Sequence, residues 1–203
     1  MKRLRWYDYI TINLFWLGLN FRNTAVGTII MPYLVDVFAP ADVRNTAFTA
    51  LRASGMLIAL IAQPAFGLLS DRSTSRFGRR RPYILLGVLL DLAFLAAMAL
   101  SLNYWMLLAS VLLLQFSANI SHGALQGLIP DLAPEDQKGR ASAFKAVFEL
   151  LAIILVALSI ARIAGAGQIE WAIAATAGAL LFIMILTMIF VREEPLREKP
   201  DTP

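Results

Sequence analysis

The stretch "GLLSDRSTSRFGRRRPYI", residues Gly67 to Ile84, places five arginines and one aspartate between two long apolar runs. In this chain 59% of the residues are hydrophobic and only 16% are charged, so the concentration of charge at this point is unusual. A soluble domain of 203 residues would cover itself with far more charge than this chain carries. The composition therefore indicates a membrane protein, in which this stretch is a polar loop between two membrane spans.

Six apolar runs are long enough to cross the hydrocarbon core, which needs about 20 residues of helix. They cover residues 9–34, 46–69, 82–101, 104–129, 143–164 and 169–191. Helices are expected because a membrane-spanning barrel would instead show short segments of alternating polarity. We predict an all-α membrane domain of six transmembrane helices over residues 1–191, followed by a polar tail or linker over residues 192–203.

The basic residues mark one side of the predicted domain. They gather in the first residues, the second-to-third connection, the fourth-to-fifth connection and the tail, whereas the opposite connections hold only Arg44 and Arg162. By the positive-inside rule both termini face the cytoplasm, which places the chain in the inner or plasma membrane. A pI of about 9.7 does not indicate a nucleic-acid partner here, because the basic residues lie at the ends of apolar runs.

The spacing within the arginine-rich loop indicates more than a signal for orientation. Gly67 lies four residues before Asp71, on the same helix face, where a glycine lets another helix approach closely. Asp71 ends a helix, where the helix dipole disfavours a negative charge, so the acid needs a partner. Gly78 suits a turn and Pro82 suits the first turn of the next helix. The alternative is that the arginines only retain the loop in the cytoplasm, which explains the charge but not the pattern.

This loop resembles the signature between the second and third helices of the major facilitator superfamily. The five residues between Arg72 and Gly78 make it most similar to the sucrose–cation symporters and the glycoside–pentoside–hexuronide symporters. A second stretch, "GLIPDLAPEDQKGRASAF" at residues 127–144, resembles the fourth-to-fifth helix connection of the same transporters. The resemblance implies one half of a twelve-helix body, with six helices arranged as a 3+3 inverted repeat.

In that family the loop is a conformational latch between the two halves and not a substrate site. The resemblance assigns the latch to Gly67, Asp71, Arg72, Gly78, Arg79 and Arg80. Asp71 would cap the helix and pair with cations, and the arginines would be those cations. One departure is that many proton-coupled members carry an arginine in an R-x-x-x-G motif of the fourth helix. The corresponding stretch "LLQFSANISHGALQG", residues 113–127, contains none.

Ionisable side chains inside the spans cost about 2.5–3.5 kcal/mol each on insertion scales, so each one needs a function or a partner. At about 1.5 Å per residue, two of the basic side chains fall in the outer half of the membrane and the remaining groups lie deeper. We predict an outer basic layer of Arg22 and Arg52 above an inner layer of Asp91, His122 and Glu149. The two layers would bind a polar solute and a proton, and Asn119 would hydrogen-bond the solute.

Each of these candidates also has a structural explanation. The alternatives are ion pairs of Arg22 or Arg52 with Asp36 or Asp42, a pair of Glu149 with Lys145, a packed neutral His122, and a peripheral position for Asp91. Gln63 and Pro64 are candidates for a gating bend in the second helix, because proline interrupts the helical hydrogen bonds.

The leading functional hypothesis is a secondary active transporter of a sugar or similar polar solute, coupled to H⁺ or Na⁺. The chain has one His, no Cys and no phosphate-binding loop, so we expect no enzyme activity, no metal and no cofactor. The alternative is a non-transporting assembly or pigment-delivery factor on the same scaffold. Because six helices make half a transporter, we expect a second six-helix half as partner, either a separate chain or another copy in a homodimer.

Overall fold

The computed structural model describes residues 3–191, and all regular structure in that range is helical. The elements are α1 (Trp6–Ala25), the π-helical turn η1 (Val26–Ile30), α2 (Met31–Phe38), α3 (Arg44–Asp71), α4 (Arg81–Ala99), α5 (Tyr104–Gln126), α6 (Leu128–Leu132), the 3₁₀ turn η2 (Glu135–Gln137), α7 (Lys138–Leu158), α8 (Ile160–Gly165) and α9 (Ile169–Phe190). The tail predicted for residues 192–203 lies outside the described residues.

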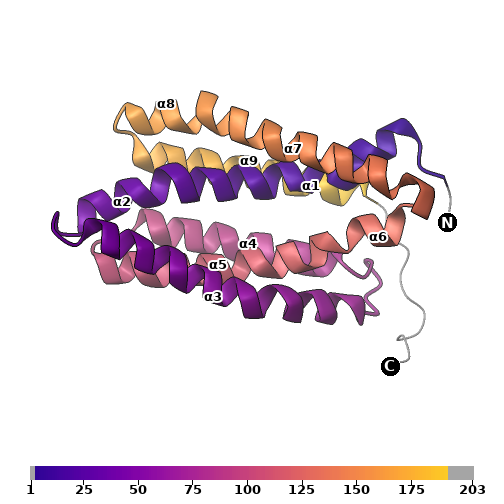
Figure 1. The fold of residues 1–203 in the computed structure, drawn as a ribbon, viewed down its shortest axis with the longest axis horizontal. Helices are drawn as coiled ribbons and strands as arrows, with labels where there is room; N and C mark the ends of the chain where they lie inside the picture. The colour runs from indigo at the N-terminus through magenta and orange to yellow at the C-terminus, as the bar shows by residue number, and fades with distance from the viewer. Residues whose placement is uncertain (1–2, 192–203) are drawn as a thin grey trace.

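The long helices run roughly along one axis and form a bundle (Figure 1). One group contains the continuous stretch α1–η1–α2 with α7, α8 and α9, and the other contains α3, α4, α5 and α6. Within the groups α1 packs against α7 and α9, and α5 packs against α3 and α4. Contact between α4 and α9 joins the two groups.

Five helical stretches in the described range are long and apolar enough to cross a membrane. They are Arg44–Asp71, Arg81–Ala99, Tyr104–Leu132, Glu135–Gly165 and Ile169–Phe190, which correspond to the second to sixth predicted runs. The first predicted run forms α1, η1 and α2, which together extend along the bundle (Figure 1). It is not among the five, and its Arg22, Asn13, Asn20 and Asn23 make it less apolar. The chain is therefore a multi-pass membrane protein.

The connections that hold most of the basic residues meet at one end of the bundle. Arg3 forms an ion pair with Asp136, between α6 and α7, at 3.1 Å, and Arg81 donates a hydrogen bond to the carbonyl of Met188 in the last turn of α9. The N-terminal segment, the loop after α3, the connection before α7 and the end of α9 are thus neighbours. The basic residues that are separated in the sequence therefore gather at one end of the folded bundle.

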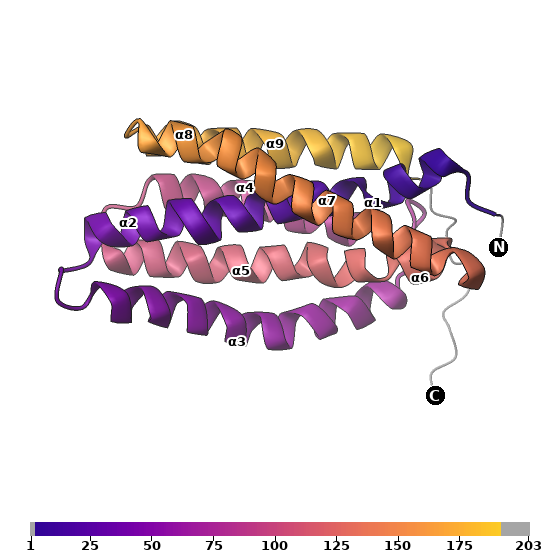
Figure 2. The same ribbon diagram turned by 45° about the horizontal axis from the view of Figure 1, so that its top comes forward.

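A close approach of α3 and α5 depends on Gly123. A Cβ at this position would lie 2.4 Å from the carbonyl oxygen of Gln63 and 2.8 Å from the amide nitrogen of Gly67. A Cβ on Gly67 itself would meet the carbonyl of Gly123 at 3.7 Å, an ordinary contact. The helix approach predicted at Gly67 is present, but Gly123 is the residue that cannot carry a side chain. Helix α3 continues through Pro64 and bows gently (Figure 2).

Candidate solute-binding site and charged cluster

A cavity of about 630 Å³ lies between the α1–η1–α2 stretch, α3 and α5. Its apolar wall includes Val26, Met31, Phe48 and Val111. Its polar lining consists of Arg22, Asn23, Thr49, Arg52, Gln63, Gln115, Asn119 and His122. Pockets for small organic ligands occupy roughly 300–1,000 Å³, so the cavity has the size of a small-molecule site.

One face of α5 supplies three of the polar lining residues. Gln115, Asn119 and His122 follow each other at intervals of four and three residues, which places them on the same side of a helix. The side-chain nitrogen of Asn119 donates to the backbone carbonyl of Gln115 at 2.7 Å. The side-chain oxygen of Asn119 is left available to accept a hydrogen bond from a ligand. Sequence analysis selected Asn119 and His122 as candidates but not Gln115.

Arg52 reaches the cavity from α3 and is exposed. Its guanidinium lies 5.7 Å from the centre of the Phe48 ring and 3.5 Å from the carbonyl of Gly27, in the π-helical turn. These contacts are long, so the guanidinium retains hydrogen-bonding capacity. The π-helical turn also widens the first helix at this point, as such turns often do at functional sites.

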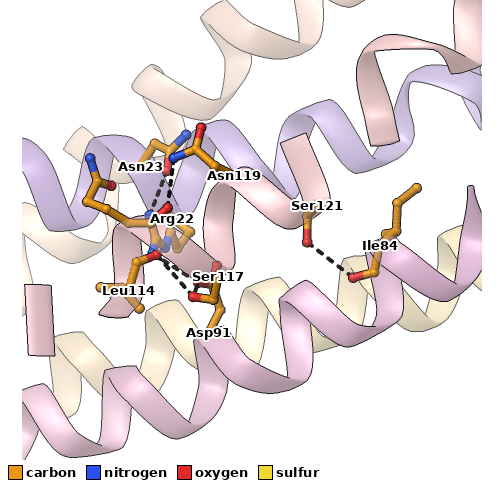
Figure 3. Close-up of polar contacts among 9 residues, drawn as sticks. Arg22, Asn23, Ile84, Asp91, Leu114, Ser117, Asn119 and Ser121 are labelled. Atoms are coloured by element: carbon orange, nitrogen blue, oxygen red, sulfur yellow. Dashed lines mark hydrogen bonds and ion pairs between the residues drawn. The ribbon is translucent and has the colours of Figure 1, made fainter. Parts of the chain in front are cut away.

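Arg22 and Asp91 form an ion pair beneath the cavity (Figure 3). The Nη2 of Arg22 lies 3.1 Å from Oδ1 of Asp91 and also donates to the carbonyl of Leu114 at 2.8 Å, while Nη1 donates to Oδ1 of Asn23 at 2.8 Å. Ser117 donates its hydroxyl proton to Asp91. The arrangement ties α1, α4 and α5 together through groups that are almost completely buried.

The Arg22–Asp91 ion pair corrects the prediction of an outer basic layer and an inner acidic layer for these two residues. Arg22 and Asp91 were expected at different depths, but they are in direct contact. The alternative partner of Arg22, Asp36, instead pairs with Arg44 at 3.0 Å. Counting residues along each helix fails here because it locates the Cα atoms, whereas the long arginine side chain carries its charge more than one helical turn away.

The candidate residues divide between three places. Arg22, Arg52, Asn119 and His122 line the cavity, whereas Asp91 lies beneath it on α4. Glu149 lies on α7, which contributes nothing to the lining of this cavity. The functional roles of these residues remain predictions. Among the described residues, no group of three or more His, Asp or Glu side chains is placed to hold a metal ion.

Glu149 belongs to a second polar cluster, between α1, α5 and α7. Its Oε1 lies 3.7 Å from Nζ of Lys145, as expected from their spacing of four residues. The same Nζ lies 3.7 Å from the centre of the Trp16 ring, and Trp16 contacts the ring of His122 edge to face at 5.4 Å. The sequence identified His122, Lys145 and Glu149 but not Trp16, whose role depends on how the helices pack.

Three residues of the predicted latch, Asp71, Arg79 and Arg80, form a charged cluster with Asp131 at the basic end of the bundle. The guanidinium of Arg80 binds Oδ1 of Asp71 at 2.5 Å and Oδ2 of Asp131 at 2.6 Å. Arg80 also donates to the hydroxyl of Ser70, and Arg79 pairs with Asp131. Sequence analysis placed Asp71, Arg79 and Arg80 in a latch but did not assign Asp131, which lies within the second quoted motif.

Two glycines make this cluster possible. A Cβ on Gly127 would lie 1.7 Å from Cζ of Arg80, so the guanidinium occupies the space that a side chain would fill. Gly78 has φ of +105°, a backbone conformation that favours glycine, and it turns the loop toward α4. Arg72 is exposed at the end of α3, unlike the nearly buried Arg80.

The structure is a bundle of membrane-spanning helices with a partly polar cavity between them. The family model of the Major Facilitator Superfamily matches residues 14–203, and the chain belongs to that family.

Three curated relatives agree with this family membership. A sucrose transport protein of Oryza sativa is 32% identical over 43% of this chain and 20% of its own length. The membrane-associated transporter protein of Mus musculus is 26% identical over 92% of this chain and 39% of its own length. The proton-associated sugar transporter A of Homo sapiens is 32% identical over 59% of this chain and 18% of its own length. The chain thus matches well under half the length of each relative.

Proposed function

We propose that this chain is the N-terminal half of a secondary active transporter that moves a sugar or similar polar solute, coupled to a proton or sodium gradient. The observation that carries the proposal is the 630 Å³ cavity, whose wall combines several amide side chains with the exposed Arg52. Amides donate and accept hydrogen bonds at once, which suits a solute rich in hydroxyl groups. The names of the sucrose and proton-associated sugar transporters among the relatives support the same class of solute.

The helix contacts support a 3+3 inverted repeat. If the spans are numbered in chain order, the first packs on the fifth and sixth, and the fourth packs on the second and third. Exchanging the first span with the fourth, the second with the fifth and the third with the sixth leaves this set of contacts unchanged. Repeats of this kind surround a midplane site in transporters that work by alternating access.

A second six-helix half completes the proposed transporter, either as a separate chain or as a second copy of this one. Large apolar side chains of α3 and α7, including Met56, Leu60 and Leu150, are exposed and available for lipid or for that half. By the positive-inside rule, the charged end of the bundle lies on the cytoplasmic side of the inner or plasma membrane. There Asp71, Arg72, Gly78, Arg79 and Arg80, with Gly67, act as the latch on the second half.

The alternative function, a non-transporting assembly or pigment-delivery factor, does not account for the polar cavity. A scaffold gains nothing from placing Gln115, Asn119 and His122 in one row that faces a cavity. Because polar groups inside a membrane are costly, such a row favours solute binding.

Uptake of radiolabelled sucrose into proteoliposomes tests this function. The purified chain, alone and together with a second half if one is found, should accumulate sucrose under an imposed proton or sodium gradient. Asn119→Leu should abolish the uptake, whereas Asn45→Leu, exposed at the start of α3, should leave it unchanged. If a folded dimer of this chain takes up no sucrose, the homodimeric transporter is contradicted. If uptake is also absent after a second half is added, the proposed transport function is contradicted.

A further inference from the structure

The ion pairs Arg22–Asp91 and Lys145–Glu149 differ in burial and in the number of groups that hold them in place. Arg22 and Asp91 are 2% and 1% exposed, and a carbonyl, an amide and a hydroxyl group hold the pair in place. The side chains of Lys145 and Glu149 are 31% and 37% exposed, and their charged atoms are 3.7 Å apart. The first pair is fixed, and the second is accessible and loose.

Lys145 has two stabilising partners at the same distance. Its Nζ lies 3.7 Å from Oε1 of Glu149 and 3.7 Å from the centre of the Trp16 ring. A cation over an indole ring is attracted by its negative face, with a strength comparable to that of an accessible ion pair. The ammonium group can therefore leave the carboxylate without losing all stabilisation.

The ring that receives the ammonium is fixed in position. Trp16 is buried, and its ring lies nearly perpendicular to the ring of His122 on α5, with 5.4 Å between the two centres. Because α1 packs directly on α7, the ring stays beside Lys145 whatever the state of Glu149.

His122, which contacts the Trp16 ring, is a titratable neighbour of this cluster and forms no ion pair among the described contacts. The other charged and titratable groups on the elements packed against α7 are engaged elsewhere or exposed. On α1, Tyr7 and Asp8 bond to Arg5, Tyr9 stacks on Phe144, and Arg22 pairs with Asp91. Asp131 on α6 pairs with Arg79 and Arg80, Glu135 and Asp136 on η2 pair with Lys138 and Arg3, and Arg162 on α8 is exposed.

We propose that Glu149 is a binding site for one monovalent cation, and that Lys145 occupies the site until the cation arrives and then rests on Trp16 alone. The carboxylate accepts either a proton or Na⁺, and the tethered ammonium competes with both. The inference rests on the proposed transport function, since it assigns the coupling cation to a position within this half.

Infrared difference spectroscopy of the purified chain in liposomes measures binding at carboxylates directly. One arm titrates Na⁺ against N-methylglucamine at constant ionic strength, and the other arm varies pH without Na⁺. The arm that responds identifies the cation. A saturable carboxylate signal is expected in the unaltered chain and in Glu170→Gln, which removes an exposed acid at the start of α9, and no such signal is expected in Glu149→Gln.

The competing role of Lys145 gives the sharper comparison. Lys145→Gln should bind Na⁺ at least tenfold more tightly, or take up a proton at least one pH unit higher, because the competitor is gone. Lys145→Met tests the same point if the glutamine variant does not fold. In a chain whose other tryptophans, Trp6, Trp105 and Trp171, are replaced by Phe, the cation should change Trp16 fluorescence only while Lys145 is present.

Two results overturn the proposal: a full carboxylate signal in Glu149→Gln, or unchanged cation affinity in the Lys145 variants. Sucrose uptake separates this inference from the proposed function. If sucrose is taken up but no cation binds at Glu149, the cation site is contradicted and the transport function stands. If a cation binds at Glu149 but sucrose is not taken up, the transport function is contradicted and the cation site stands.

Discussion

The guanidinium of Arg22 and the carboxylate of Asp91 lie 3.1 Å apart between α1 and α4, and both side chains are almost completely buried. The pair neutralises two charges that would otherwise be exposed to an apolar environment. It also fixes the floor of the cavity, because Arg22 contributes to the lining from one side and binds Asp91 on the other.

Removing only one partner of this pair should be strongly destabilising. Asp91→Leu leaves a buried guanidinium without its counter-charge, and we expect the free energy of unfolding to fall by about 3–5 kcal/mol. Unfolding of the purified protein in detergent, followed by circular dichroism, measures the loss. The double variant Arg22→Met/Asp91→Leu should lose much less, and equal losses in the single and double variants would contradict the ion-pair account.

Gly123 should tolerate no side chain. The methyl group of Gly123→Ala would lie 2.4 Å from the carbonyl of Gln63, so α3 and α5 must separate, at a cost of about 1–3 kcal/mol. The matched control is Gly178→Ala on α9, where a Cβ meets nothing within 4 Å. Since alanine favours a helix more than glycine does, that control should unfold at the same temperature or higher. A smaller effect at Gly123 than at Gly178 is the contrary result.

Arg80 should not be replaceable by lysine. One guanidinium binds Asp71, Asp131 and Ser70 at once, and the single ammonium of Arg80→Lys cannot reproduce that fork. We expect backbone amides in the loop at residues 72–80 to exchange at least tenfold faster, measured by hydrogen–deuterium exchange. Arg76→Lys, at an exposed arginine of the same loop, is the control. Equal exchange in the two variants would show that the cluster does not order the loop.

Arg52 should contribute directly to solute affinity. A hydrogen bond to a charged group contributes about 1.5–3 kcal/mol, so Arg52→Gln should weaken sucrose binding roughly tenfold or more. Arg44→Gln provides the control, because Arg44 lies on the same helix but outside the cavity and pairs with Asp36. Equilibrium dialysis with labelled sucrose measures both affinities, and equal weakening would indicate a general charge effect instead of a contact.

The helical elements and the charged loop were predictable because they depend on local sequence. Apolar runs bounded by polar residues predicted the helix ranges from α3 to α9 within several residues. The spacing of Asp71, Gly78 and Pro82 predicted a helix end, a turn and a helix start, all of which are present.

Contacts between distant helices were not predictable in the same way. Depth counted along each helix separated Arg22 from Asp91, because such counting ignores how far an arginine reaches. Trp16 was not selected, since an apolar aromatic residue gives no sign in the sequence of the cation above its ring. The role of Gly123 likewise appears only when α5 is placed against α3.

The most direct test of the account is a binding titration of the purified chain with labelled sucrose, comparing the unaltered chain with Asn119→Leu and Asn45→Leu. Saturable binding that is lost in Asn119→Leu and retained in Asn45→Leu is the predicted result, because only Asn119 lines the cavity. Binding that is unaffected by Asn119→Leu would contradict the claim that this cavity is the solute site.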